Sequence, residues 1–113
     1  MANLYKSILY FNNGMHERIN VGLIMFDDKQ CIVDIKQSKM DFVKIYKPES
    51  YELFEYTINK FKEYYLSSSV DDNYSSLKRS SVYNNGIFKV EEPNIINIEL
   101  NEENFRKFFD RHI

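Results

Sequence analysis

The sequence predicts an α+β domain in which an antiparallel-rich sheet of about five strands carries helices packed mainly on one face. Runs rich in β-branched and aromatic residues, bounded by Asn, Gly and Asp, are typical of strands. A longer segment with apolar residues three and four positions apart is typical of an amphipathic helix. Only 3 Gly and 2 Pro occur in 113 residues, and 43% of the residues are hydrophobic, which indicates a folded core. The expected order is strand, strand, strand, helix, helix, loop, strand, strand, helix, in a single domain spanning residues 1–113.

Three strands are expected in the first third of the chain, at residues 4–11, 18–26 and 31–36. The first has apolar side chains at both alternating positions, which predicts a strand covered on both faces. Its two sets are Leu4, Ile8 and Tyr10 on one face, and Tyr5, Leu9 and Phe11 on the other. Polar residues at 27–30 predict a tight reversal, so the second and third strands are expected to form an antiparallel hairpin.

Helices are expected in the middle and at the end of the chain. Ser38 is expected to cap a short helix that stops at Pro48, and Pro48 suits the first turn of a longer helix running to about residue 66. The apolar stripe expected to face the core of that helix comprises Leu53, Phe54, Thr57, Ile58, Phe61, Tyr64 and Tyr65. Strands are expected at 87–90 and 95–100, and Asn101 is expected to cap a last helix with acidic residues in its first turn and basic residues near its end.

Composition and charge exclude several classes of protein. A net charge of -2 argues against a nucleic-acid-binding protein that works by bulk electrostatics, because such proteins need a basic face. A single cysteine excludes an internal disulfide and a cysteine-rich zinc site, and its apolar surroundings favour a packing role for Cys31. The apolar part of the N-terminus is too short for a signal peptide or a membrane span, so a cytoplasmic protein is expected.

The candidate site is the polar entrance to the second strand, His16, Glu17, Arg18, Asn20 and Gly22. In a regular strand, alternate residues share a face, so Arg18, Asn20 and Gly22 would lie together, with Gly22 leaving room for a close approach. The guanidinium and amide would then suit a carboxylate, a phosphate or a backbone loop. The alternative is structural: Arg18 and Asn20 hold neighbouring loops, and Gly22 admits a helix packed on the sheet.

Catalytic patterns are incomplete. His16 as a general base with Glu17 as its orienting carboxylate would suit a small hydrolase or nuclease, but adjacent residues rarely orient one another and no nucleophile lies nearby in sequence. His16, Glu17 and His112 could bind a metal, but no local spacing favours it. No two glycines lie close enough together to form a phosphate-binding loop. The sequence therefore assigns no catalytic residue, cofactor or metal, and it favours a non-catalytic protein while leaving enzymatic activity open.

The run YKSILYFNNGMHERINVGLIMFDD, residues 5–28, resembles the opening of a bacterial protein family known as domain of unknown function 3037. The family pattern is a strand, a short turn and a Glu-Arg-x-Asn-x-Gly motif leading into an apolar strand. Here the motif is Glu17, Arg18, Asn20 and Gly22, followed by Phe26. The tail is similar too, with a strand at 87–90, a Glu92-Pro93 turn and an aromatic-rich closing helix at 105–113.

The resemblance implies a protein without established enzymatic activity, because the family has none. Family members are often encoded beside HipA-like kinases, relatives of the kinase toxin of toxin–antitoxin systems. A non-catalytic interaction or regulatory module is therefore expected, with an antitoxin-like role toward a HipA-like kinase in a toxin–antitoxin or defence system. Its binding surface would be the Arg18/Asn20 face or the loop at 67–81. A mobile-element-encoded inhibitor in host–phage conflict stays an alternative, and the oligomeric state stays open.

Overall fold

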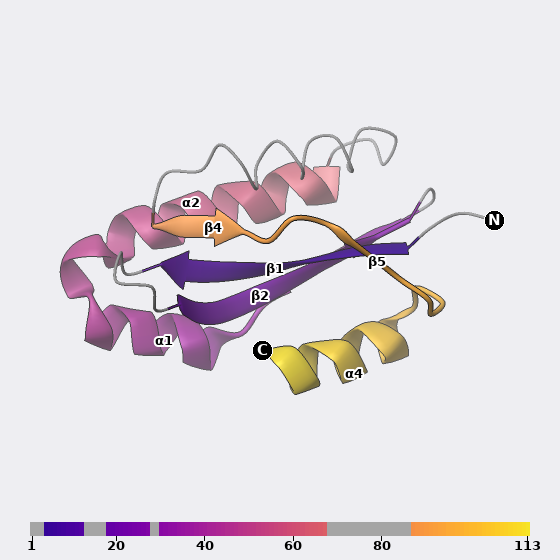
Figure 1. The fold of residues 1–113 in the computed structure, drawn as a ribbon. Helices are drawn as coiled ribbons and strands as arrows, with labels where there is room; N and C mark the ends of the chain where they lie inside the picture. Colours follow the sequence, from indigo (N-terminus) through magenta and orange to yellow (C-terminus); the bar gives the residue numbers. More distant parts are fainter. Residues whose placement is uncertain (1–3, 13–17, 28–29, 68–86) are drawn as a thin grey trace.

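The computed structural model describes residues 4–12, 18–27, 30–67 and 87–113, which form a five-stranded antiparallel sheet and three helices (Figure 1). The elements in chain order are β1 (Leu4–Asn12), β2 (Arg18–Phe26), β3 (Cys31–Ile35), α1 (Gln37–Tyr46), α2 (Pro48–Ser67), β4 (Phe88–Val90), β5 (Asn94–Ile96) and α4 (Glu102–His112). The predicted fold class and element order are confirmed.

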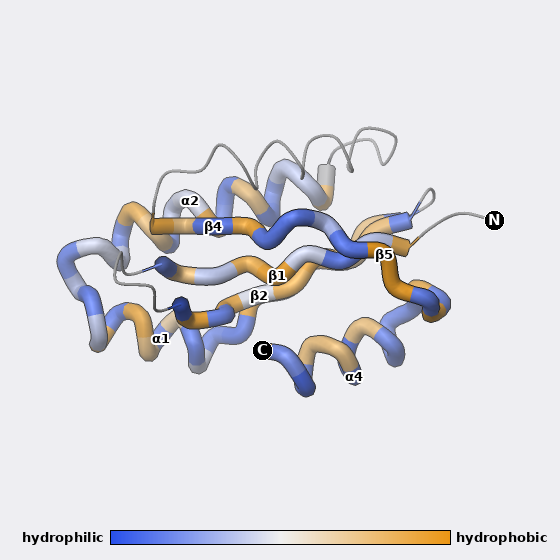
Figure 2. The backbone as a smooth tube through the Cα atoms, in the orientation of Figure 1, coloured by the Kyte–Doolittle hydropathy of each residue, from blue (hydrophilic) through white to orange (hydrophobic). Residues whose placement is uncertain are grey.

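The sheet is built around β1, which pairs with β2 on one side and with β4 and β5 on the other. The strand order is β3-β2-β1-β4, and β5 continues the edge that β4 begins. Residues 9–11 of β1 pair with β4, whereas residues 4–6 pair with β5. Because β1 is a central strand, hydrophobic residues recur along its whole length (Figure 2).

Helices α1 and α2 cover one face of the sheet and enclose the larger of two cores, here called the first core. Its buried members are Leu9, Phe11, Val21, Ile24, Phe26, Val33, Met40, Val43, Tyr51, Phe54, Ile58, Tyr65, Phe88 and Val90. Phe54 lies at its centre, with its ring edge-on to Phe11 at 5.1 Å and tilted against Phe88 at 6.1 Å between centroids. Pro48 opens α2, as predicted, since the first turn does not need its missing N–H.

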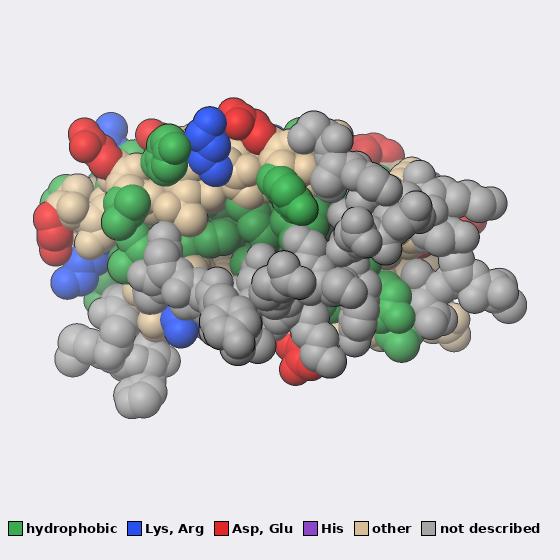
Figure 3. Space-filling model, turned by 90° about the horizontal axis from the view of Figure 1, so that it is seen from above, with side chains coloured by type: hydrophobic (Ala, Val, Ile, Leu, Met, Phe, Trp, Pro, Cys, Tyr) green, Lys and Arg blue, Asp and Glu red, His purple; other side chains and the backbone are tan. Residues whose placement is uncertain are grey.

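The stripe by which α2 faces the first core differs from the predicted one at three positions. The side chains of Leu53 and Tyr64 are 59% and 52% exposed, whereas Tyr51 is buried. The buried residues run from Tyr51 through Phe54 to Ile58 in steps of three and four, and Leu53 lies one position off that line. Hydrophobic side chains therefore also lie among charged ones on the outer surface that Figure 3 shows.

Helix α4 covers the opposite face of the sheet and encloses the second core (Figure 1). The buried members of the second core are Leu4, Ile8, Leu23, Met25, Leu100, Phe105, Phe109 and Ile113. The Asn101 side chain accepts a 2.8 Å hydrogen bond from the Asn104 backbone N–H, which confirms the predicted cap. Two helices thus share one face, as expected, while α4 makes a third layer. Both predicted faces of β1 are covered, with Leu4 and Ile8 in the second core and Leu9 and Phe11 in the first.

Two predicted element boundaries are wrong. Ser38 does not cap α1: the helix begins at Gln37, and Lys36 occupies the cap position without a side-chain hydrogen bond. The last strand ends at residue 96 instead of 100, because Ile96 already pairs with Leu4, the first described residue of β1.

Cys31 packs partly buried against the first core, and burial raises its thiol pKa to about 12, so the predicted packing role is confirmed.

Asp34 on β3 forms ion pairs with one helix on each face of the sheet. Its carboxylate lies 2.6 Å from Arg106 of α4 and 3.7 Å from Lys62 of α2. Partial burial alone would raise its pKa, but the hydrogen bonds from Arg106 and from the Ile35 N–H, together with the charges of Arg106 and Lys62, hold the pKa below its ordinary value. The carboxylate therefore stabilises the fold in its ionised form.

Asp34 makes stability depend on pH in a defined direction. Because its pKa is lower in the folded than in the unfolded protein, the stabilisation is complete above the unfolded value, about 4, and is lost as the pH falls through the folded value. We expect Asp34→Asn to unfold at lower urea than wild type at neutral pH, with the difference shrinking below about pH 4. A difference that stays constant with pH would contradict this account.

The neighbouring residues Phe54 and Leu53 provide a matched test of the first core. Phe54→Ala is expected to lower the free energy of unfolding by about 3–5 kcal/mol, because it leaves a cavity among buried rings. Leu53→Ala removes an exposed side chain and is expected to change it by about 0.5 kcal/mol or less. Urea unfolding followed by circular dichroism measures both, and equal losses would show that the helix is rotated from the orientation described.

Candidate functional site

The pairing of β1 with β2 shifts by one residue in the middle of the sheet. Leu9 pairs with Gly22, but the next residue, Tyr10, pairs with Asn20, which leaves Val21 as an extra residue in β2. Such a β-bulge breaks the alternation of side chains between the two faces of the strand. Residues before the bulge therefore face the opposite way from the direction that a regular strand gives them.

The expectation that Arg18, Asn20 and Gly22 share one face is therefore wrong. Gly22 pairs with Leu9, a member of the first core, and Val21 belongs to that core as well. Asn20 faces the other way and contacts α4, on the side of the second core. The bulge thus separates Gly22 from the two polar side chains that precede it.

Gly22 serves the sheet itself. A Cβ atom at this position would lie 2.8 Å from the Asp34 backbone oxygen and 3.3 Å from the Leu9 side chain. The first distance is shorter than a carbon and an oxygen tolerate, and the oxygen belongs to the backbone of β3. Glycine therefore admits the neighbouring strand, where the sequence suggested a packed helix or space for a ligand.

Arg18 connects three segments of the sheet. Its Nη2 atom donates to Glu91 Oε2 at 2.7 Å, directly after β4, and its guanidinium lies over the Tyr10 ring, 4.3 Å from the centroid. Arg18 therefore connects the start of β2, across β1, to the segment that follows β4. The side chain is 38% exposed, and a guanidinium has five N–H donors, so Glu91 does not exhaust its capacity to bind an anion.

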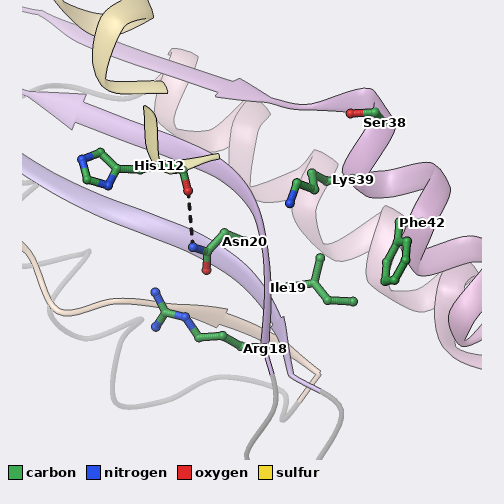
Figure 4. Close-up of a pocket in the computed structure, with 7 residues that line it drawn as sticks. All are labelled: Arg18, Ile19, Asn20, Ser38, Lys39, Phe42 and His112. Carbon is green, nitrogen blue, oxygen red and sulfur yellow. Dashed lines mark hydrogen bonds between the residues drawn. The ribbon is translucent and has the colours of Figure 1, made fainter. Parts of the chain in front are cut away.

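Asn20 holds the end of α4 against β2. Its Nδ2 atom donates to the His112 backbone oxygen at 3.4 Å, a long hydrogen bond (Figure 4). Its Oδ1 atom is buried and accepts no hydrogen bond from the described part of the chain. A buried acceptor without a donor costs about 1–3 kcal/mol.

A groove of about 510 Å³ lies beside Asn20, between α1 and the last turn of α4 (Figure 4). It is lined by Arg18, Ile19, Asn20, Ser38, Lys39, Phe42 and His112. These residues come from β2, from α1 and from the end of α4, and the fold brings the three elements together. The volume falls within the range of about 300–1,000 Å³ that is usual for ligand sites.

Lys39 gives the groove its uncompensated positive charge. Its side chain extends from α1 toward the side of the groove that Asn20 lines (Figure 4). In the described segments no carboxylate lies within ion-pair distance of its ammonium group, whereas Arg18 is paired with Glu91. Lys39 also lies in the first turn of α1, which contains no acidic residue, at the positive end of the helix dipole. The groove is therefore suited to an anionic group.

Two predicted candidates, His16 and Glu17, and nearly all of the predicted loop 67–81 lie outside the described residues. Ser38, Lys39 and Phe42, in contrast, were missed by the sequence reasoning. The spacing of Lys39 and Phe42 places them on one side of α1, but no local pattern shows that this side meets β2. The second histidine, His112, lines the groove, and its ring packs on Phe108 at 4.6 Å between centroids.

The comparisons with known proteins add no relative: no protein-family model, no curated protein and no solved structure matches this chain. None of the described helices is long and apolar enough to cross a membrane. Across the same residues, no group of three or more His, Cys, Asp and Glu side chains is placed to hold a metal ion.

The positive charge of Lys39 is expected to lower stability. Lys39→Glu would place an acidic residue in the first turn of α1, so we expect the free energy of unfolding to rise by about 0.3–1 kcal/mol. Lys44→Glu, in the last turn of the same helix, is the matched control and is expected to lower it. Urea unfolding measures both variants. A loss of stability in Lys39→Glu would mean that Lys39 has a structural partner and is not held for a ligand.

Proposed function

We propose that this protein is a non-catalytic protein-interaction module that binds an acidic segment of a partner protein in the groove between α1 and α4. The observation that carries the proposal is the position of Lys39, a cation without a described carboxylate partner, at the positive end of a helix dipole. The guanidinium of Arg18 adds hydrogen-bond donors on the β2 side of the same groove.

The surface beside the groove supports a protein partner. Phe42 lines the groove with 53% of its surface exposed, and its ring stacks on Tyr46 at 6.0 Å between centroids. Ile45, between them in sequence, is 82% exposed. Aromatic side chains are enriched at the energetic centres of protein interfaces. A partner segment lying in the groove would thus find an apolar surface along α1 next to the charged one.

The lining of the groove favours binding over catalysis. It contains one hydroxyl, Ser38, and one imidazole, His112, which come from opposite sides of the groove and share no hydrogen bond (Figure 4). A nucleophile and its base need hydrogen-bond contact. The thiol of Cys31 has a pKa of about 12 and is therefore protonated at neutral pH. The hydrolase alternative depends on His16 and Glu17, outside the described residues.

The partner that the family resemblance suggests is a HipA-like kinase, which this protein would regulate in an antitoxin-like manner. The resemblance carries this part of the proposal through the motif of Glu17, Arg18, Asn20 and Gly22. In the structure two of these four residues, Arg18 and Asn20, line the groove. A partner of this kind would place the protein in the cytoplasm.

Affinity capture from the native cells tests the proposed function. Tagged wild type and Lys44→Gln are expected to retain the same partner, identified by mass spectrometry, whereas Lys39→Gln is expected to lose it. Both substitutions remove one positive charge from α1, so charge alone does not distinguish them. Circular dichroism verifies that both variants fold. Equal capture by Lys39→Gln and wild type would overturn the proposal.

A further inference from the structure

We propose that Asp34 and Lys62 close the outer edge of the sheet at β3 and so prevent this strand from pairing with β3 of a second copy of the chain. β3 is the last strand on its side of the sheet, because it pairs with β2 and with no other described strand. A strand in this position presents backbone N–H and C=O groups on which another strand can form. The proposal concerns the edge of the sheet and does not depend on the groove between α1 and α4.

Every second residue of β3 directs its backbone groups away from β2. At one end of the hairpin the Lys36 N–H donates to the Val21 oxygen at 2.7 Å. At the other end the Asp27 N–H donates to the Gln30 oxygen at 3.0 Å, and the register between the two strands contains no shift. Bonded and unbonded residues alternate along an antiparallel pair, so the even-numbered residues from 30 to 36 bond to β2. The residues whose backbone groups point outward are Cys31, Val33 and Ile35.

The Asp34 side chain occupies one of these outward donors. Its Oδ1 atom accepts a 2.8 Å hydrogen bond from the N–H of Ile35, and its Oδ2 atom lies 2.6 Å from Arg106 Nη2 on α4. Although partial burial opposes it, the hydrogen bond from Arg106 holds the pKa of Asp34 below its ordinary value, so the carboxylate is ionised at neutral pH. A hydrogen bond to an ionised acceptor is roughly twice as strong as one to a neutral carbonyl. An incoming strand would therefore have to displace a stronger acceptor from Ile35.

The Lys62 side chain crosses the same edge. Asp34 belongs to the face of the second core, because directly paired residues share a face and its partner in β2 is Leu23. Helix α2 covers the opposite face, yet Lys62 Nζ lies 3.7 Å from Asp34 Oδ1. Since a side chain cannot pass through a paired sheet, Lys62 reaches Asp34 around the outer side of β3. A lysine at a strand edge disfavours pairing, because an added strand would remove its charge from water.

Without this closure the edge of β3 is complementary to a second copy of itself. In an antiparallel pair with its two-fold axis at Val33, Cys31 of one copy faces Ile35 of the other, and all three outward residues form hydrogen bonds. This register uses the Ile35 N–H of both copies, so the bond to Asp34 blocks it at both ends. Cys31, Ile32 and Ile35 are only half-buried, and an added strand would cover them further.

Three variants compare the closed and the open edge. Asp34→Ala removes the acceptor of the Ile35 N–H, whereas Lys62→Gln removes only the charge that crosses the edge. Lys60→Gln is the matched control, since Lys60 pairs with Glu63 of its own helix. In sedimentation measurements over a range of concentrations, we expect Asp34→Ala to self-associate about tenfold or more tightly than wild type. Lys62→Gln is expected to change in the same direction, and Lys60→Gln to behave as wild type.

Nuclear Overhauser contacts between copies locate the new interface. In a mixture of labelled and unlabelled Asp34→Ala protein, we expect contacts from Cys31 of one copy to Ile35 of the other. Circular dichroism verifies that each variant folds, and if Asp34→Ala does not, both measurements are made on Lys62→Gln, which keeps the bonds of Asp34 to Ile35 and Arg106. Folded variants that associate no more tightly than wild type overturn the proposal. Tighter association through contacts outside β3 overturns it as well.

Discussion

The β-bulge at Val21 determines which side chains face which layer of this molecule. Residues of β2 beyond the bulge place their apolar side chains in two cores, one on each face of the sheet. Before the bulge, Asn20 faces α4, where it meets the last helical turn. Without the extra residue, Asn20 would point into the first core, where an amide would need partners that apolar side chains cannot supply. The bulge thus turns Asn20 toward α4, where its side chain lines one side of the groove.

The structural and functional roles of the candidate residues are therefore connected. Arg18 and Asn20 are engaged by their own chain, through Glu91 and the His112 carbonyl, and these contacts set the shape of one side of the groove. The guanidinium donors of Arg18 that Glu91 leaves open lie beside the groove that α1 completes. Lys39 adds charge at a helix terminus that disfavours it, and a residue kept at such a cost is typical of a binding site.

Much of the fold follows from local patterns. The two apolar faces of β1 predicted a strand covered on both sides, and Asn101 with its acidic neighbours predicted the start of α4. The pattern could not show which helix covers which face, because an apolar face on a strand says only that something packs there. On α2, Leu53 and Tyr64 recur at the same three- and four-residue spacing as their buried neighbours. Only tertiary packing determines that these two side chains are exposed.

The candidate site was predicted less completely. Arg18 and Asn20 were identified from their residue types, but their orientation was wrong because one glycine in a strand is compatible with a bulge, a kink or a close approach. Gly22 was the available sign of irregularity, and here it marks both the bulge and the approach of the β3 backbone. Lys39 and Phe42 lie about twenty residues from Asn20 in sequence, and their meeting is a consequence of the fold.

The measurement that tests this account most directly is the set of nuclear Overhauser contacts of the Asn20 side-chain amide in the labelled protein. The account predicts contacts from these amide protons to His112 and Ile113 at the end of α4. Contacts to Val43 or Phe11 of the first core would contradict it. In that case β2 would be a regular strand, the groove would not have the described lining, and the function proposed for it would be withdrawn.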